Sequence, residues 1–581
     1  MRRLRRLLAS LVLIIAAAPF AAGAQVIERN LPEAPKAPPA VIIGPSGLSA
    51  DTDDTTLVPA IRQIVVLGAA DAPLAGAGSG EEGAAVSVER APDFARARAD
   101  RALRRFIGRP LSRKRIGQIE AAIVQAYRRA GLPFVDVSTP PQDVSDGRLQ
   151  IRVVEFHLGR VKVIGTSSAD AAHIKGSLRV ETGQPIEATL LSQDLDWLNR
   201  YPFRGLSAAF SQGNALGVTD LTLTATRSRP YSLYAGYDNS GSPATGEDRY
   251  FLGAQMGLPL LRDATLAYQL TGSRDFWDDH GRILDDPHPL YLSQGGRLAV
   301  PTAPRQALEL TFSAVETNQP AQVFVIRSVT TEATLGYRFA ASDAWRVLPG
   351  DFNAGIEAKR QHRDNLFGGV SVASGAVSVY QAFAGWSGSW TDAAGRTDVD
   401  ATVHVSPGGL SPGDRNSAYQ AFTQGRVRRA DYTYVDADLN RSSQLPWNLV
   451  LTDAVSTQIA GVALPDSERI ALGGVQAVRG YSLDDGAYDD GVTLRNDLRL
   501  KGAPLFENGA ATLERPFLIG DIGAARDEAA RRSRTFSSVG LGWTAHIGPA
   551  ALSLAASDPL VSGPATRAGR WRADLRLTAT Y

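Results

Sequence analysis

From Tyr231 onward, apolar and polar positions alternate in segments of about ten residues, and turns rich in Gly, Asp, Asn and Pro separate these segments. Successive side chains of a strand point to opposite faces, so each segment presents one apolar and one polar face. The last segment shows both faces in full. Its apolar face consists of Trp571, Ala573, Leu575, Leu577, Ala579 and Tyr581. Its polar face consists of Arg572, Asp574, Arg576, Thr578 and Thr580.

This alternation predicts a transmembrane antiparallel β-barrel over residues 229–581, with lipid outside and water inside. A soluble β-sandwich is the alternative, but the alternation continues to the end of the sequence without a helical segment, which favours the barrel. About eleven strands with their loops fit into residues 231–470, and the total near sixteen is even, as in most single-chain bacterial barrels. The five later strands are predicted at Gly491–Lys501, Leu513–Gly523, Thr535–Ile547, Ala550–Ser557 and Trp571–Tyr581.

Two smaller modules with mixed periodicity precede the barrel. In residues 61–155, a strand candidate at Ile61–Leu67 comes before a helix that Ser112 is placed to cap, and two more strands follow at Phe134–Val137 and around Ile151. The helical face of this first module carries Ile116, Ile119, Ile123 and Tyr127.

Residues 156–228 repeat this order of elements. A short strand with Val161 and Val163 precedes a helical face with Leu191, Leu195 and Leu198, and two alternating strands follow. These strands carry Leu206, Ala208 and Phe210, then Leu221, Leu223 and Ala225. We therefore predict two α/β modules with a β-α-β-β-like order, at 61–155 and 156–228.

The N-terminal residues are typical of an exported protein. Residues 1–24 have a basic start, an apolar run from Leu7 to about Ala18, and small residues that end in Ala22-Gly23-Ala24, which is the pattern of a secretory signal peptide. A membrane anchor is the alternative, but the run is short and Pro19 interrupts it. Residues 25–60 are proline-rich and predict a linker or extended arm.

The amino-acid composition excludes several classes of protein and of function. The chain is 44% hydrophobic and 21% charged, which is too apolar for disorder and too polar for a helical membrane protein. There is no cysteine, which excludes thiol catalysis, disulfides and thiolate metal sites. Without the four arginines of the predicted signal peptide (Arg2, Arg3, Arg5 and Arg6), 57 basic side chains face 60 acidic ones, so no basic excess predicts nucleic-acid binding.

A glycine-flanked motif lies between the eleventh and twelfth predicted strands. It runs from Asp466 to Tyr481 and contains Gly473-Gly474 and Val478-Arg479-Gly480-Tyr481. This LGG…VRGY pattern resembles the large inward-folded loop of the outer-membrane insertase/transporter superfamily. With a signal peptide and only two N-terminal modules, the chain most resembles the two-partner secretion transporters (TpsB, of the haemolysin-activator and adhesin-secretion type), and the two modules resemble the POTRA domains of that family.

Two other stretches carry the same resemblance, which covers residues 61–581. The stretch from Pro141 to Glu155 is similar to the end of the family's first POTRA domain, and the stretch from Asp238 to Arg249 is similar to its first barrel hairpin. The resemblance implies domains at 1–24 (signal peptide), 25–60 (linker), 61–155 (POTRA 1), 156–228 (POTRA 2) and 229–581 (barrel).

The family pairs the loop arginine with an aspartate on a later strand. Asp521 and Gly523 match that pattern on the thirteenth predicted strand, whereas Ile519 replaces the usual aromatic residue or glycine. A guanidinium inside a barrel needs a carboxylate, and removing one partner of a buried pair costs about 3–5 kcal/mol. An exposed loop arginine is the alternative, but the glycine-flanked setting of Arg479 and the matching Asp521 favour a clamp in the lumen.

The resemblance implies protein export. A secreted exoprotein of the TpsA type would reach the periplasm unfolded, dock on the POTRA domains by strand addition to a sheet edge, and thread through the barrel to the surface of a Gram-negative cell without ATP. Outer-membrane lipid, the barrel assembly machinery during biogenesis, and a monomeric state are the other expectations. The family also has an N-terminal plug helix, but the prolines of residues 25–60 disfavour a long one.

Other functions have weaker support. An outer-membrane insertase would usually carry more POTRA modules, and a passive porin would need neither these modules nor the VRGY loop. The G-x-S-x-G match at Gly409–Gly413 is expected to be a turn that leads to another strand, and the GxGxxG match at Gly78–Gly83 a flexible loop. The acidic loop that begins at Asp275 could hold a divalent cation, but a solvated loop is favoured. We predict no catalytic residue, cofactor or metal.

Overall fold

A computed structural model describes residues 26–32, 42–43, 52–69, 71, 85–88, 93–132, 134–215, 217–278, 289–345, 348–502, 504–507 and 511–581. The chain divides into two compact units, one formed by Ala34–Arg229 and one by Met1–Glu33 with Pro230–Tyr581. The signal peptide predicted at residues 1–24 and most of the linker predicted at 25–60 lie outside the described residues, and the domain boundaries drawn from the sequence remain predictions.

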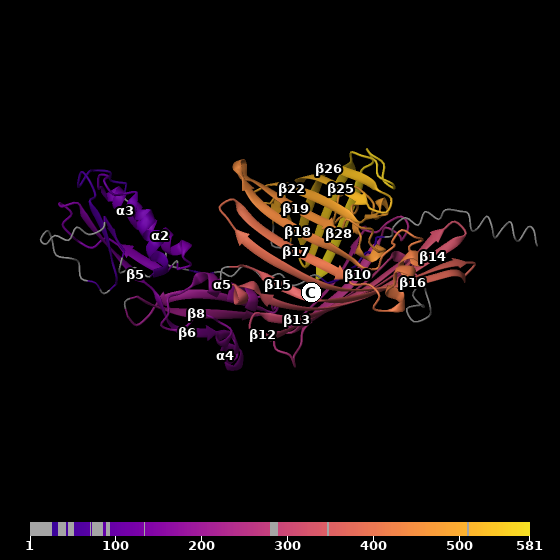
Figure 1. The fold of residues 1–581 in the computed structure, drawn as a ribbon, viewed down its shortest axis with the longest axis horizontal. Coiled ribbons are helices and arrows are strands. Elements are labelled where there is room, and N and C mark those ends of the chain that lie inside the picture. Colours follow the sequence, from indigo (N-terminus) through magenta and orange to yellow (C-terminus); the bar gives the residue numbers. More distant parts are fainter. Residues whose placement is uncertain are drawn as a thin grey trace, which may run out of the picture. The chain divides into compact units, whose positions relative to one another are not determined.

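The first module of the Ala34–Arg229 unit is a four-stranded sheet covered by two helices (Figure 1). The strand order is β3-β2-β5-β4, with β2 parallel to β3 and β5 and β4 antiparallel to β5. The elements are β2 (Gln63–Leu67), β3 (Val86–Ser87), α2 (Asp93–Arg104), α3 (Arg113–Arg129), β4 (Val135–Ser138) and β5 (Arg148–Glu155).

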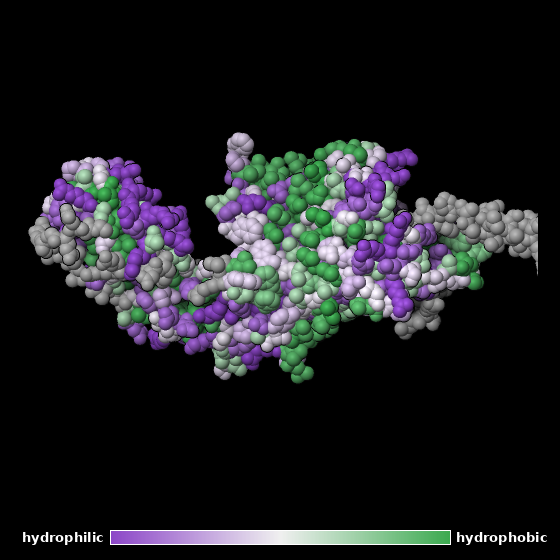
Figure 2. Space-filling model, viewed as in Figure 1, coloured by the Kyte–Doolittle hydropathy of each residue, from purple (hydrophilic) through white to green (hydrophobic). Residues whose placement is uncertain are grey.

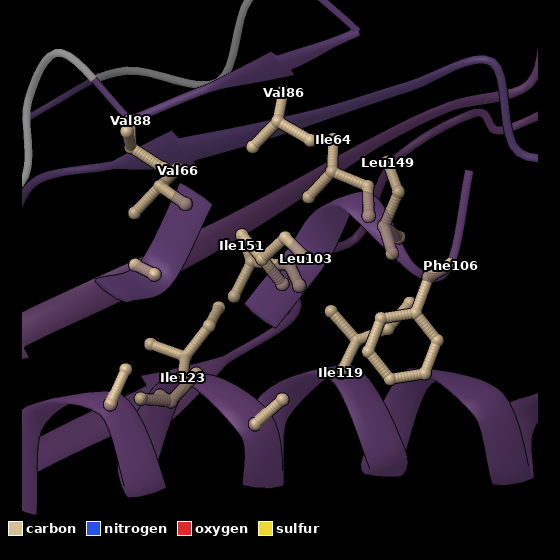
Figure 3. Packing of buried hydrophobic residues seen from close by; sticks show 14 of the residues in the cluster. Ile64, Val66, Val86, Val88, Leu103, Phe106, Ile119, Ile123, Leu149 and Ile151 are labelled. Atoms are coloured by element: carbon tan, nitrogen blue, oxygen red, sulfur yellow. The ribbon is translucent and has the colours of Figure 1, made fainter. Parts of the chain in front are cut away.

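The core of this module lies between the sheet and the two helices. Figure 3 shows Ile64 and Ile151 of the sheet packed toward Leu103 of α2 and Ile119 and Ile123 of α3. The predicted cap of α3 is present, because the Ser112 hydroxyl accepts a hydrogen bond from the amide of Arg115 at 3.2 Å. Helix α2 and strand β3 are additions that the sequence patterns did not predict.

The second module is also a four-stranded sheet, in the order β1-β7-β8-β6. Its apolar core gathers Leu191, Leu195 and Leu198 from one helix and the alternating residues of the last two strands, as the patterns predicted. Helix α4 and strand β1 are additions to the prediction. The elements are β1 (Ile42–Ile43), β6 (His157–Ile164), α4 (Ser168–Gly176), α5 (Ala188–Leu198), β7 (Arg204–Gln212) and β8 (Val218–Arg227).

The second unit is a closed antiparallel barrel of sixteen long strands, which confirms the predicted fold class. They are β9 (Tyr231–Asp238), β10 (Arg249–Gly257), β11 (Thr265–Gly272), β12 (Tyr291–Ala303), β13 (Gln306–Ala321), β14 (Phe324–Ala340), β15 (Asp351–Phe367), β16 (Val370–Thr391), β17 (Gly395–Ser406), β18 (Tyr432–Leu445), β19 (Leu449–Ile459), β22 (Asp490–Leu500), β25 (Phe517–Asp527), β26 (Arg532–Ile547), β27 (Ala550–Pro559) and β28 (Arg572–Thr580). The barrel closes between β28 and β9 over five residue pairs, from Arg576↔Asp238 to Thr580↔Tyr234.

The count of eleven strands before residue 470 agrees with β9 to β19. One late strand lies further along the chain than predicted, because β25 covers Phe517–Asp527 rather than Leu513–Gly523. Leu513 instead ends β24 (Ala511–Leu513), which pairs with the two-residue β23 (Phe506–Glu507) and with β26. A short apolar strand at the end of a hairpin has the same alternation as a spanning strand, which explains the shift.

The outer face of the barrel is apolar. Figure 2 shows hydrophobic residues gathered over the barrel strands. Exposed and buried positions alternate along the strands, so that Leu518 and Ile522 of β25 are exposed while Ile519 and Asp521 are buried. No helix among the described residues is both long and apolar enough to cross a bilayer. The exposed apolar face fits lipid, and the buried polar face lines the lumen.

Candidate functional site

The VRGY motif lies in the long segment of residues 460–489 that connects β19 to β22, the eleventh and twelfth barrel strands. This segment, called the lumenal loop below, folds back on itself as a short hairpin in which β20 (Ile470–Ala471) pairs with β21 (Ala487–Tyr488). Two single turns, η3 (Asp466–Glu468) and η4 (Leu483–Asp485), lie at its two ends. Both Leu472 and Val478 are fully buried, so the hairpin packs against the barrel wall rather than projecting into water.

Arg479 joins the lumenal loop to β25. Its side chain donates to both oxygens of Asp521, from Nε and from Nη2, each at 2.7 Å. The Arg479 amide also donates to Asp521, and Nη1 donates to Asp497 Oδ1 of β22 at 2.8 Å. Arg479 and Asp521 are only 3% and 1% exposed. The structure therefore brings the two predicted residues together in a bidentate, buried ion pair.

The predicted glycines lie where no side chain fits. A Cβ on Gly473 would come within 2.0 Å of the Ser482 carbonyl oxygen, and a Cβ on Gly523 would come within 2.9 Å of Val478 Cγ2. Gly474 and Gly480 have φ values of +99° and +90°, the left-handed region that glycine adopts without steric cost. The absence of a side chain at Gly523 of β25 thus leaves room for Val478. The glycines of the loop itself allow it to turn sharply on both sides of the motif.

Tyr481 anchors the far side of the motif. Its hydroxyl accepts hydrogen bonds from the amides of Ser537 and Val561 and donates to the Val561 carbonyl at 2.6 Å. Its ring meets Phe536 of β26 edge-to-face, with 4.8 Å between ring centroids. The ring and Val478 belong to one apolar cluster between the loop and the wall. All four residues of the VRGY motif therefore fix the loop to strands β25 to β27 and the segment after β27.

A second anchor holds the other end of the lumenal loop, and sequence reasoning missed it. Glu468 is 4% exposed, and one oxygen, Oε2, accepts hydrogen bonds from Lys359 Nζ at 2.9 Å, Gln381 Nε2 at 3.0 Å and the Tyr434 hydroxyl at 2.7 Å. These partners come from β15, β16 and β18, a different part of the wall from the strands that hold Arg479. Glu468 is part of the motif's sequence, but its spacing gave no sign of three partners on distant strands.

The N-terminal residues 26–32 lie inside the barrel. Glu28 accepts two hydrogen bonds from Arg249, at 2.8 and 3.0 Å, and Arg249 is 1% exposed. Arg29 donates to Glu332 of β14 at 2.7 Å and to the carbonyl of Ser467 in the lumenal loop. These described residues form no helix, so the segment occupies the lumen as an extended peptide. Arg249 is the last residue of the predicted first-hairpin motif, and its partner could not be read from the sequence.

A cavity of about 420 Å³ remains between the segment, the loop and the wall. Its lining is rich in both charges, which fits a water-filled lumen. No group of three metal-ligating side chains occurs among the described residues. The charged lining includes Arg29, Arg297, Glu309, Glu332, Arg338, Glu357, Lys359 and Glu468.

Of the two motif matches that resemble enzyme sites, the structure describes only the one at Gly409–Gly413. A short helix, α8 (Asn416–Phe422), follows Gly409–Gly413, so the expectation of a strand there was wrong. The buried Ser411 Oγ has no hydrogen-bond partner, so no base is placed to activate it. Gly78–Gly83 and the loop residues after Asp278 lie outside the described residues.

These features define a class of protein: an outer-membrane β-barrel with periplasmic POTRA-type modules and a lumenal loop fixed to the barrel wall. Comparison with known proteins agrees. A family model described as haemolysin secretion/activation protein ShlB/FhaC/HecB matches residues 217–545, more than half of the sequence, and the chain belongs to this family. A second model, the ShlB-type POTRA domain, matches residues 84–155.

Individual relatives are proteins described as transporters. The chain is 26% identical over 150 residues to the outer membrane transporter CdiB-2 of Burkholderia pseudomallei, covering 25% of this chain and 24% of that protein. It is 20% identical over 405 residues to the heme/hemopexin transporter protein HuxB of Haemophilus influenzae, covering 68% of each. The chain thus spans about a quarter of the first relative's length and about two thirds of the second's.

A solved structure of CdiB from Escherichia coli matches with a TM-score of 0.66 and 17% identity, covering 92% of this chain and 93% of that one. CdiB from Acinetobacter baumannii matches with a TM-score of 0.57 and 15% identity, covering 100% and 97%. These matches support the fold. With the family match, they confirm the resemblance to two-partner secretion transporters and the expected location in the outer membrane, and they favour a transporter over an insertase.

Proposed function

We propose that this protein recognises one unfolded exoprotein of the TpsA type in the periplasm and exports it through the barrel to the cell surface without ATP. The observation that carries this proposal is the lumenal loop, which buried ion pairs hold inside a barrel that also belongs to a secretion family. A passive pore has no need for such a loop, and the charged cavity beside it lies in the lumen that an unfolded chain would cross.

The anchors suggest how the lumen can conduct a polypeptide and still keep its loop. Arg479 and Tyr481 hold one end of the loop against β25 to β27. Glu468 and residues 26–32 close the space toward β14 to β18. Displacement of residues 26–32, together with release of Glu468, would widen the existing cavity while Arg479 keeps the loop attached.

The remaining partners follow from the same proposal. The POTRA modules would capture the exoprotein, lipid would surround the apolar barrel face, and the barrel assembly machinery would insert the chain as a monomer. No step needs a cofactor or a catalytic residue, because threading an unfolded chain breaks no covalent bond.

The test is export by the Arg479→Ala variant in cells that also produce a candidate exoprotein of the TpsA type, sought among the large repetitive secreted proteins encoded by neighbouring genes. We expect loss of the exoprotein from the surface while the barrel remains in the outer membrane and stays heat-modifiable on gels. Arg499→Ala is the matched control, because Arg499 also pairs with Asp497, at 3.2 Å, but does not touch the loop. Normal export by Arg479→Ala would refute the mechanism. Deletion of residues 61–228 should also stop export, and survival of a simple diffusion activity alone would favour a porin.

A further inference from the structure

The connection between β17 and β18, residues 407–431, is a folded segment, called the mouth loop from here on. It contains the single turn η1 (Pro412–Asp414) and the short helix α8. Because the periplasmic modules lead directly into β9, the connections after the first, third and every later odd-numbered barrel strand lie at the extracellular end. β17 is the ninth barrel strand, so the mouth loop lies at the same end as the lumenal loop, which follows the eleventh.

The mouth loop packs on the barrel wall above the end of β17. β16 begins at Val370, but β17 pairs with it only from Ala382 onward, and the mouth loop lies against part of the strand in between. Tyr419 of α8 is fully buried, and its hydroxyl donates to the carbonyl of Ser378 at 3.1 Å. The Tyr419 ring belongs to one apolar cluster with Val379 of the same strand.

These contacts place the mouth loop at the extracellular end of the charged cavity. Val379 shares a face of β16 with Phe383, which lies further toward the periplasm and lines the cavity. On β18, Tyr434 belongs both to the apolar cluster of the mouth loop and to the cavity lining. A polypeptide that leaves the cavity toward the cell surface therefore meets the mouth loop.

Arg426 joins the mouth loop to both ends of the lumenal loop. At the beginning of the lumenal loop, its Nη2 donates to Asp466 Oδ1 at 3.1 Å and to the carbonyl of Leu464. At the end of the lumenal loop, its Nη1 donates to Asp489 Oδ1 at 3.2 Å. The Asp489 side chain is fully buried, so one guanidinium ties the two loops together in the interior.

This connection can open without leaving a buried carboxylate uncompensated. Asp466 also pairs with Arg363 at 3.3 Å, and Asp489 also pairs with Arg469 at 3.5 Å. Removal of one partner from a buried ion pair is costly because the other charge is left alone. Here each carboxylate keeps a second guanidinium, and the Arg426 side chain, already 20% exposed, can be hydrated at the mouth.

We propose that the mouth loop is a lid on the extracellular end of the lumen, that Arg426 latches it to the lumenal loop, and that it leaves β16 when the exported chain emerges. This inference rests on the proposed export function and adds a gate to it. The lid opens while the lumenal loop stays in place, because Arg479 and Tyr481 hold that loop on other strands, β25 to β27.

A disulfide between the mouth loop and β16 tests the movement, in a chain that has no cysteine of its own. A Cβ on Gly413 would lie 3.4 Å from Ser378 Cβ, close to the separation of about 3.5–4.5 Å that a disulfide needs. In Gly413→Cys/Ser378→Cys, we expect export to fall in proportion to the disulfide-linked fraction on non-reducing gels and to recover with reductant. Export at the parent level by the linked variant would overturn the lid, and failure of the disulfide to form would contradict the contact itself.

The matched control links two barrel strands below the mouth loop. In Val405→Cys/Thr433→Cys, the bond joins β17 to β18, which are already paired at these residues, and the mouth loop can still leave β16. This variant and both single-cysteine variants of the lock should export like the parent. An equal loss of export in the strand-linked control would assign the effect to a stiffened barrel and overturn the lid. If the parent exports nothing, the proposed function fails, and channel recordings still decide whether the mouth loop is a lid.

Planar-bilayer recordings of the purified full-length chain measure opening without an exoprotein. Arg426→Met keeps an apolar stem but loses the bonds to Asp466 and Asp489. We expect the open probability to rise by about tenfold or more, because a hydrogen bond between charged groups contributes a factor of about ten or more. Arg428→Met is the matched control, since it removes an exposed cation two residues along the same loop. An unchanged open probability in Arg426→Met, or an equal rise in both variants, would refute the latch.

A combined variant separates the mouth loop from the lumenal loop, because Arg426 contacts both. When Gly413→Cys/Ser378→Cys is added to Arg426→Met, the open probability should return to the parent level while the disulfide is intact and rise again on reduction. Opening that stays high in the linked form would show that the lumenal loop, and not the mouth loop, is the gate.

Discussion

Loss of the Asp521 carboxylate should release the lumenal loop, and the size of the effect follows from burial. In Asp521→Ala, the guanidinium of Arg479 would remain almost fully buried. It would keep a hydrogen bond at 2.8 Å to the Asp497 carboxylate, which is 20% exposed, and a longer one at 3.4 Å to the Asn496 carbonyl. Breaking a buried ion pair by removal of one partner costs about 3–5 kcal/mol. Because each 1.4 kcal/mol is a factor of ten, the population of the released loop should rise by about two to three and a half orders of magnitude.

Maleimide labelling of a single cysteine can measure this population, since the parent chain has none. Ala477 is 7% exposed and lies two residues from Arg479, so a cysteine there reacts only when the loop leaves the wall. We expect slow labelling of Ala477→Cys in the parent and labelling faster by about a hundredfold or more after Asp521→Ala.

Asp497→Ala is the informative control, because Asp497 bonds the same guanidinium from a more exposed position. A partly exposed pair contributes about 0.2–1 kcal/mol, so labelling should rise by less than about tenfold. Equal labelling in the parent and in Asp521→Ala would show that the buried pair does not hold the loop, and the argument from burial would be wrong.

Three further changes should each affect one feature. Glu468→Gln keeps the shape of the second anchor but removes its charge, which should cost about 1.5–3 kcal/mol and make the lumenal loop more sensitive to protease in detergent. Gly473→Ala places a methyl group against the Ser482 carbonyl and should cost about 1–3 kcal/mol, seen as faster exchange of the loop amides in a barrel that still migrates as folded. Hydrogen bonds and the charge from Arg160 lower the pKa of Asp220. This pair therefore stabilises the second module above about pH 4, and its contribution is lost as the pH falls. Arg160→Met should speed hydrogen exchange in β6 and β8 relative to the parent at pH 6 but not at pH 3.

Each of these changes has a neutral counterpart. Glu357→Gln alters a carboxylate that contacts Lys359 but not the loop, and protease sensitivity of the loop should stay as in the parent. Gly520→Ala adds the same methyl group on β25 where nothing lies within 4 Å. Lys162→Met removes a neighbouring cation on β6 without touching Asp220. Effects as large as those of the test variants would show that general damage, not the named contact, is measured.

The sequence predicted the barrel well because its signal is repeated. Alternation recurs in sixteen strands, so an error in one, such as the four-residue shift of β25, does not change the count. The same holds for α3, whose buried face repeats large apolar residues such as Ile119, Ile123 and Tyr127 at helical spacing. Helix α2 was missed because its buried face is formed by small or isolated residues, Ala99 and Leu103, among many arginines, and such a face gives little periodic contrast.

The site was predictable only where a motif fixed both partners. Arg479 and Asp521 each belong to a recognisable local pattern, and the fold brings them together. Glu468 has partners 34, 87 and 109 residues away, and Glu28 has one 221 residues away, and no local pattern marks those partners. The pairing of β1 with β7 is of the same kind, because two residues in a proline-rich segment are too few for strand periodicity to show.

The seam between β28 and β9 has a consequence for biogenesis. It joins residues such as Arg576 and Asp238 that are separated by most of the chain, and the register of its two strands covers five residue pairs. Contacts of such high sequence separation form late, so a nascent barrel must carry two open, adhesive borders until its final strand arrives. We therefore predict that folding of this barrel is faster when a factor shields those borders, and that closure of the seam is the slow step.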